Sequence, residues 1–287
     1  MGSKTKKLLK TGAKFLITAL AIYFVFSKID WPQVRDLLLG VNPVYLVLAM
    51  LFFVLSKVIS AFRLQLFFRS IDLTISHQYN LKLAWVGMFY NLFLPGGIGG
   101  DGYKVYLLNK QYGTKVKLLI QASLLDRISG LISLLMLAGI GFLLLDLSAL
   151  PAWVKYTDIV CLLLSVPSLY VLSRLLFKAF VSVVTKSLIW SLGVQLMQVI
   201  SALLILAAIG INTDQIAYSV LFLISSFVSI LPFTIGGLGS REVTFLLGFE
   251  YFGIEESYSI ALSLLFTLIT AVVSFGGVFM NVDQPTS

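Results

Sequence analysis

The sequence predicts an all-α membrane protein that crosses the bilayer several times, on two observations. The first is composition, because 59% of the 287 residues are hydrophobic and only 12% are charged, whereas soluble domains average roughly 45–50% apolar and about 25% charged residues. The second is the length of the apolar runs, since a membrane-spanning helix needs about 20 mostly apolar residues. The stretches long enough to consider are 8–26, 43–68, 80–108, 118–145, 158–178, 187–209, 216–252 and 257–280.

Six of these stretches predict full transmembrane helices, and the first is expected to be retained rather than cleaved. A basic start followed by an apolar run is typical of a signal peptide, but this run continues to Phe26 and is nearly long enough to span a bilayer. The single cysteine, Cys161, excludes an intramolecular disulfide, and the single histidine, His77, excludes a histidine-rich metal cluster. We therefore expect one transmembrane domain over residues 1–287, with no metal and no cofactor.

The two remaining stretches are interrupted by similar sequences rich in glycine. The first reads LPGGIGGD from Leu94 to Asp101, and the second reads LPFTIGGLGSRE from Leu231 to Glu242. Breaks at corresponding places in the two halves of a chain are typical of internally duplicated transporters. The pattern therefore predicts two repeats, over residues 1–145 and 158–280.

The distribution of Lys and Arg indicates whether the broken stretches cross the bilayer or turn back, because cytoplasmic loops carry an excess of positive charge. If both stretches turn back, fourteen of these residues lie in the cytoplasm, four lie outside and three lie within helices. If both cross, the cytoplasmic and outer counts become eight and ten. We therefore expect two re-entrant helical hairpins, at about 80–108 and 216–252, an inverted-topology repeat, and both termini on the cytoplasmic side of the inner cell membrane.

Each break predicts irregular backbone that lines a polar cavity or is buried in protein, because unpaired backbone groups cost several kcal/mol in lipid. A helix that restarts after such a loop directs free N–H groups into the cavity, which favours an anion such as a phosphate. The glycines also fit the alternative that they only permit close hairpin packing. A G-x-G-x-x-G match at Gly97, Gly99 and Gly102 lacks the preceding strand that dinucleotide binding requires.

Charged residues within the apolar stretches are further candidates, because an ionisable group at the bilayer centre costs roughly 2.5–3.5 kcal/mol or more. Lys57 lies near the middle of the second stretch, and Asp126 and Arg127 are adjacent in the fourth. Asp126 is expected to pair with Lys57 or Lys104. Arg127 is expected to face an anionic headgroup. Arg63 lies nearer the cytoplasmic face, and we expect it to extend toward the water.

The returning helices begin with charged residues as well. Asp101 and Lys104 lie at the start of one, and Ser240, Arg241 and Glu242 lie at the start of the other. Asp101 and Ser240 suit helix N-caps. Lys104 and Arg241 would offer cationic contacts at the mouths of the cavity, whereas Asp101 and Glu242 would accept an amine of a headgroup.

Three segments, NLFLPGGIGGDGYK, LLDRISGLISLL and LPFTIGGLGSRE, occur in this order. Together they resemble the lysylphosphatidylglycerol synthase transmembrane-region family, which includes the flippase half of the bacterial multiple peptide resistance factor. The resemblance implies movement of lipid between leaflets. In two-domain members an aminoacyl-tRNA-dependent transferase makes that lipid, and this chain is expected to lack the transferase, so we expect a transporter and not an enzyme.

The expected function is a lipid flippase or scramblase for a phospholipid, a glycolipid or a polyprenyl-phosphate-linked sugar. The expected substrate-binding residues are Lys57, Pro95, Gly96, Gly97, Gly99, Gly100, Asp101, Lys104, Asp126, Arg127, Pro232, Gly236, Gly237, Gly239, Arg241 and Glu242. The alternatives are a secondary transporter of small solutes or ions, an enzyme acting on lipids, and a membrane scaffold for a lipid-modifying enzyme. We expect membrane lipids and no nucleic acid as partners; a homodimer and a partner lipid synthase or glycosyltransferase are open alternatives.

Overall fold

A computed structural model describes residues 23, 31–93, 99–145, 151–230 and 239–282, and within these ranges the chain forms helices joined by turns, without a β-strand. The all-α prediction is confirmed for this part of the protein. The predicted first span, 8–26, lies outside the described residues.

Five helical segments are long and apolar enough to cross a membrane. Each coincides with a predicted stretch to within a few residues, except that α7 begins six residues earlier than predicted. They are α3 (Pro43–Arg69), α6 (Val116–Leu143), α7 (Ala152–Leu176), α8 (Val184–Ala208) with the preceding 3-10 turn η1 (Lys178–Val183), and α11 (Glu256–Phe275) with the following turn η2 (Gly276–Phe279). A short helix, α2 (Trp31–Leu39), precedes α3.

Helix α3 begins where the sequence supplies a start signal. The side chain of Asn42 accepts a hydrogen bond from the Val44 N–H at 3.0 Å, and Pro43 occupies the first helical turn, where its missing N–H needs no partner. The helix ends with Arg69 in its last turn, where a cation favourably meets the negative end of the helix dipole.

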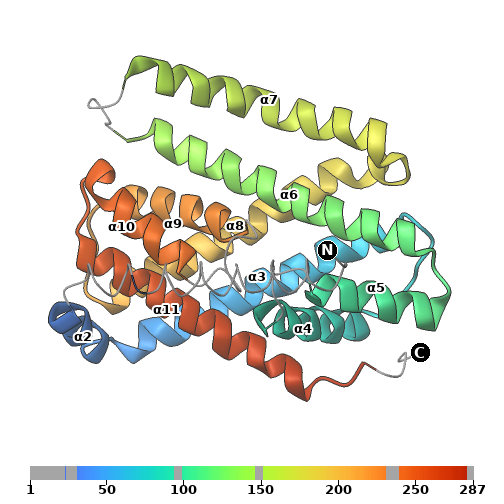
Figure 1. The fold of residues 1–287 in the computed structure, drawn as a ribbon, viewed down its shortest axis with the longest axis horizontal. Helices are drawn as coiled ribbons and strands as arrows, with labels where there is room; N and C mark the ends of the chain where they lie inside the picture. The colour runs from blue at the N-terminus through green and yellow to red at the C-terminus, as the bar shows by residue number, and fades with distance from the viewer. Residues whose placement is uncertain (1–22, 24–30, 94–98, 146–150, 231–238, 283–287) are drawn as a thin grey trace, which may run out of the picture.

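The two broken stretches each form a pair of short helices. The first pair is α4 (His77–Phe93) and α5 (Gly99–Tyr112), and the second is α9 (Gln215–Ile230) and α10 (Ser240–Phe252). With 13 to 17 residues each, these helices are about 20–26 Å long and therefore shorter than the hydrocarbon core of about 30 Å. The partners of each pair pack on one another, and Figure 1 shows the two pairs at opposite ends of the molecule.

Close packing of the first pair depends on glycine. A Cβ atom added to Gly100 would lie 1.9 Å from the carbonyl oxygen of Gly87, so α4 and α5 approach at a distance that no larger residue permits. The interpretation that these glycines serve packing is therefore correct for Gly100, which also donates its N–H to Asn91 Oδ1 at 2.8 Å.

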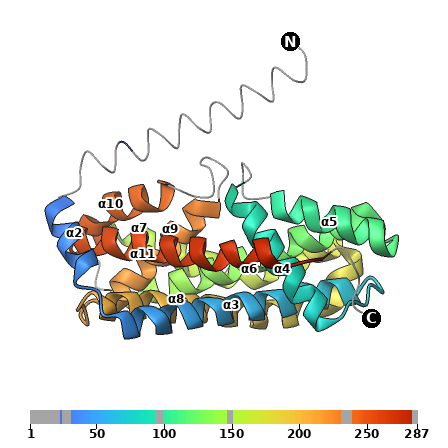
Figure 2. The ribbon, with the colours of Figure 1, turned by 90° about the horizontal axis from the view of Figure 1, so that it is seen from below.

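The long helices connect the two halves of the bundle. Helices α3 and α8 form the most extensive helix pair in the described structure, and Figure 2 shows them side by side along the lower edge. Helix α6 packs on α9, and α11 packs on α4. The long helix that follows each short pair therefore contacts the short pair of the other half.

The two ends of the bundle differ in charge. The end of α3, α5 and α7 and the start of α6 and α8 lie together in Figure 1. The basic residues at this end are Arg69, Lys110, Lys115, Lys117, Arg174, Lys178 and Lys186. The opposite end carries most of the described acidic residues, including Asp36, Asp214, Glu250, Glu255 and Glu256. We refer to the first as the basic end.

Candidate functional site

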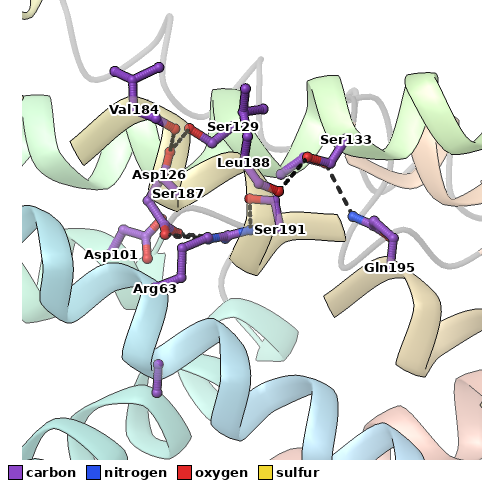
Figure 3. Close-up of polar contacts among 12 residues, drawn as sticks. Arg63, Asp101, Asp126, Ser129, Ser133, Val184, Ser187, Leu188, Ser191 and Gln195 are labelled. Carbon is purple, nitrogen blue, oxygen red and sulfur yellow. Dashed lines mark hydrogen bonds and ion pairs between the residues drawn. The ribbon is translucent and has the colours of Figure 1, made fainter. Parts of the chain in front are cut away.

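Arg63 and Asp126 form a buried ion pair between α3 and α6 (Figure 3). Arg63 Nε donates to Asp126 Oδ1 at 2.7 Å, and Nη2 donates to Oδ2 at 2.9 Å. The third nitrogen, Nη1, donates to Ser191 Oγ on α8 at 2.8 Å. The expected pairing of Asp126 with Lys57 or Lys104 was therefore wrong, and so was the expectation that Arg63 reaches the water. Arg63 remains 5% exposed because all three of its nitrogens find buried acceptors.

A line of small polar side chains continues from this ion pair between α6 and α8. Ser129 and Ser187 share a hydrogen bond of 3.1 Å, and the Gln195 side chain donates to the Gly130 carbonyl at 3.1 Å (Figure 3). Ser187, Ser191 and Gln195 recur every four residues and so share one face of α8. That spacing is the signal by which sequence reasoning could have found this polar face.

Asp101 joins α5 to α6. Its Oδ2 accepts from Arg127 Nε at 2.5 Å and its Oδ1 accepts from Lys104 Nζ at 3.3 Å. Asp101 lies in the first turn of α5, which begins at Gly99, so the expectation that it caps this helix was wrong. Arg127 was expected to face a headgroup, and the structure places its Nε on Asp101 instead, although 34% of its side chain is exposed.

Glu242 has the corresponding position at the start of α10. Its Oε2 accepts the Gly239 N–H at 3.0 Å, and its Oε1 accepts from Ser263 Oγ on α11 at 2.9 Å. The N-cap of α10 is Gly239 rather than Ser240, because a φ of 79° suits glycine and the carboxylate of Glu242 supplies the missing acceptor. Glu242 therefore positions α10 against α11, just as Asp101 positions α5 against α6.

Lys57 and Arg241 lie at the two ends of a stack of aromatic rings. Lys57 Nζ lies 4.6 Å from the centre of the Phe53 ring, and Phe53 contacts Phe266 edge to face at 5.4 Å. The guanidinium of Arg241 lies over Phe266 at 4.7 Å and over Phe222 at 5.2 Å. The stack connects a cation of α3 with a cation in the first turn of α10.

The carboxylate of Glu242, the residue after Arg241, attracts the charge of Arg241 but forms no ion pair with it in the described part of the chain. Lys57 and Arg241 belong to none of the three ion pairs there. Arg241 Nη1 is buried and has no hydrogen-bond partner among the described residues. Both Arg241 and Arg63 lie close enough to Lys57 to repel its charge. Lys57 and Arg241 are half-buried, and a cation that is partly withdrawn from water is stabilised by a nearby negative charge, so this region is suited to an anion.

Several of the expected site residues cannot be placed. Pro95, Gly96, Gly97, Pro232, Gly236 and Gly237 lie outside the described residues. The described ranges also bring no three His, Cys, Asp or Glu side chains together in the way that a metal ion would require.

These features define a polytopic α-helical membrane protein with charged residues buried between its helices. The chain belongs to the family described as "Lysylphosphatidylglycerol synthase TM region", which it matches over residues 13–277. It is also similar to a "UPF0104 membrane protein" of the archaeon Methanothermobacter thermautotrophicus, with 20% identity over an alignment covering 88% of this chain and 86% of the relative.

Proposed function

We propose that the protein moves an anionic or zwitterionic lipid between the leaflets of the cell membrane. The observation that carries this proposal is the aromatic stack with Lys57 and Arg241 at its ends, two half-buried cations that form no ion pair with a described carboxylate. A phosphate would supply the missing negative charge and accept the free donor of Arg241. The cargo would be a phospholipid, a glycolipid or a polyprenyl-phosphate-linked sugar.

The short helix pairs support this proposal as re-entrant hairpins. Each of the four helices is too short to cross a membrane by itself, and the two pairs lie at opposite ends of the bundle. Arg241 follows directly after the start of α10, so its charge adds to the positive end of that helix dipole. In this arrangement the halves form an inverted repeat, and the basic end faces the cytoplasm by the positive-inside rule.

Lipid exchange in reconstituted vesicles tests the function. Purified protein is placed in liposomes that contain a fluorescent phosphatidylglycerol, phosphatidylcholine or polyprenyl phosphate, and the outer leaflet is bleached chemically. We expect the protein to lower the fraction of fluorescence that is protected from bleaching, for at least one phosphate-bearing lipid. We expect Lys57→Gln and Arg241→Gln to slow this loss about tenfold each, whereas Lys117→Gln, at an exposed residue of the basic end, keeps the rate.

Two results would contradict the proposal. One is the absence of exchange with every lipid class, and the other is equal exchange in the Lys57 and Arg241 variants and the wild type. Mass spectrometry of the recovered lipids, before and after incubation, separates movement from chemical conversion, because an enzyme would change the mass of its substrate.

A further inference from the structure

A small pocket beside α3 contains none of the residues of the ion pairs or of the aromatic stack. Its volume is ≈ 260 Å³, and it lies between α3, the first residue of α4 and α8. The residues that line it are Phe62, Gln65, Leu66, Arg69, His77 and Trp190. Figure 2 shows α3 and α8, which contribute most of this lining, along the edge of the molecule opposite α5 and α10. The pocket shares no lining residue with the aromatic stack.

The rim of the pocket carries groups that bind anions. Arg69 is exposed and forms no ion pair with any described residue. His77 is also exposed and holds its ring edge to face against Phe62, with the ring centres 5.3 Å apart. Lys186 is exposed and precedes Trp190 by one helical turn, so the two share a face of α8. The rim therefore combines the imidazole of His77 with the guanidinium of Arg69, and Lys186 lies outside the lining on the same face of α8 as Trp190.

The floor of the pocket is aromatic and amide in character. Phe62 contacts both His77 and Trp190, and the centres of the Phe62 and Trp190 rings are 6.3 Å apart. Gln65 is 2% exposed, and its Nε2 donates to the Ile75 carbonyl at 2.8 Å. Its Oε1 is buried and accepts no hydrogen bond among the described residues. An acceptor without a donor costs free energy that a hydroxyl group of a ligand would recover.

The position of the pocket along the helices indicates the source of the ligand. Arg69 is the last residue of a membrane-spanning helix, and Trp190 lies near the start of another. Trp and cationic side chains at helix ends lie at the membrane–water interface. The phosphates of the lipid headgroups lie at the same depth, so a phospholipid reaches the pocket without leaving its leaflet.

We propose that this pocket binds the headgroup of an anionic phospholipid in the leaflet at the basic end, with the phosphate on Arg69 and His77 and a hydroxyl group of the headgroup over Gln65. The site holds a resident lipid against α3 and α8 and does not depend on transport. Phosphatidylglycerol has both the negative charge and the hydroxyl groups that this pocket matches, whereas phosphatidylcholine has no net charge and no donor.

Lipid binding to the purified full-length protein in detergent tests the proposal. Native mass spectrometry counts bound lipid during titration with phosphatidylglycerol, phosphatidylcholine or inorganic phosphate. We expect one phosphatidylglycerol to bind at least about tenfold more tightly than phosphatidylcholine, and Arg69→Gln and His77→Gln to remove most of this difference. Arg174→Gln is the matched control, because Arg174 is an exposed arginine in the last turn of α7 at the same end.

Three outcomes would overturn the proposal. If Arg174→Gln lost as much of the preference for phosphatidylglycerol as the pocket variants, the lipid would be attracted to the basic end in general. If phosphatidylglycerol binding were unchanged in both pocket variants, the lipid would bind elsewhere. Binding of inorganic phosphate as tight as that of phosphatidylglycerol would identify a free anion as the ligand.

Discussion

Arg63 of α3 and Asp126 of α6 form a bidentate ion pair, with nitrogen–oxygen distances of 2.7 and 2.9 Å, and so join two helices that are long and apolar enough to span a membrane. The side chains are 7% and 14% exposed. Because this pair uses the charge of Asp126, the acid is not available to Lys57. Lys57 therefore forms no ion pair with Asp126, and the charges of Arg241 and Arg63 repel its own.

Asp126→Asn is expected to destabilise the protein by about 3 kcal/mol, because it leaves Arg63 charged, buried and without its counter-ion. The measurement is thermal or denaturant unfolding of the purified protein in detergent. Asp36→Asn, at an exposed acid of α2, is the control and is expected to unfold as the wild type does.

Removal of both charges should be less harmful than removal of one. In Arg63→Met with Asp126→Leu, apolar side chains replace the pair and no buried charge is left alone, so the stability is expected to return toward that of the wild type. A single variant that is as stable as the wild type would show that the pair contributes nothing to folding.

The sequence predicted the helices well and the side-chain partners poorly. Hydrophobic length located α3, α6, α8 and α11 to within a few residues, whereas α7 begins six residues before its predicted start. Helices end and restart on either side of the two Pro-Gly segments, as the sequence predicted. The partner of Asp126 is 63 residues away on another helix, and spacing along one chain does not determine which helix faces come together. The cap of α10 was placed one residue too late because a glycine with positive φ, supported by Glu242, replaced the expected Ser240.

Gly100→Ala is expected to cost about 2 kcal/mol or more, because the added methyl group collides with the backbone of Gly87. The backbone cannot move aside as a flexible side chain can, so α4 and α5 must separate. Gly102→Ala is the matched control on the same helix, since nothing lies within 4 Å of its added Cβ. Equal unfolding temperatures for the two variants would contradict the close approach of α4 and α5.

Glu242→Ala is expected to lower stability by about 2 kcal/mol, because the Gly239 N–H and the Ser263 hydroxyl lose their buried acceptor. Glu242→Gln keeps one acceptor oxygen and should therefore lose less. Glu250→Ala, at an exposed glutamate of the same helix, should have no effect. The stabilities of these three variants are compared by unfolding in detergent. The decisive result is that Glu242→Ala is less stable than Glu242→Gln, which in turn is less stable than the wild type.

Arg241→Lys is expected to slow lipid exchange about tenfold while leaving the unfolding temperature close to that of the wild type. The guanidinium of Arg241 lies 5.2 Å from the centre of the Phe222 ring and 4.7 Å from that of Phe266, whereas the compact ammonium of lysine keeps the charge without the forked donors or the broad contact with the rings. The measurement is the vesicle assay above, with Arg35→Lys at an exposed position of α2 as the control. Unchanged exchange in Arg241→Lys would mean that charge alone is required at this position.

The re-entrant arrangement predicts which segments share a side of the membrane. Single cysteines are introduced into a Cys161→Ser background at four exposed positions. Thr74 and Lys115 flank the pair α4 and α5, whereas Thr213 precedes α9 and Glu250 lies in the last turn of α10. A membrane-impermeant maleimide is applied to sealed vesicles of known orientation. If each helix pair turns back, Thr74→Cys and Lys115→Cys react from one side, and Thr213→Cys and Glu250→Cys react from the other. If each pair crosses the bilayer, the two members of each set react from opposite sides, and the inverted repeat is excluded.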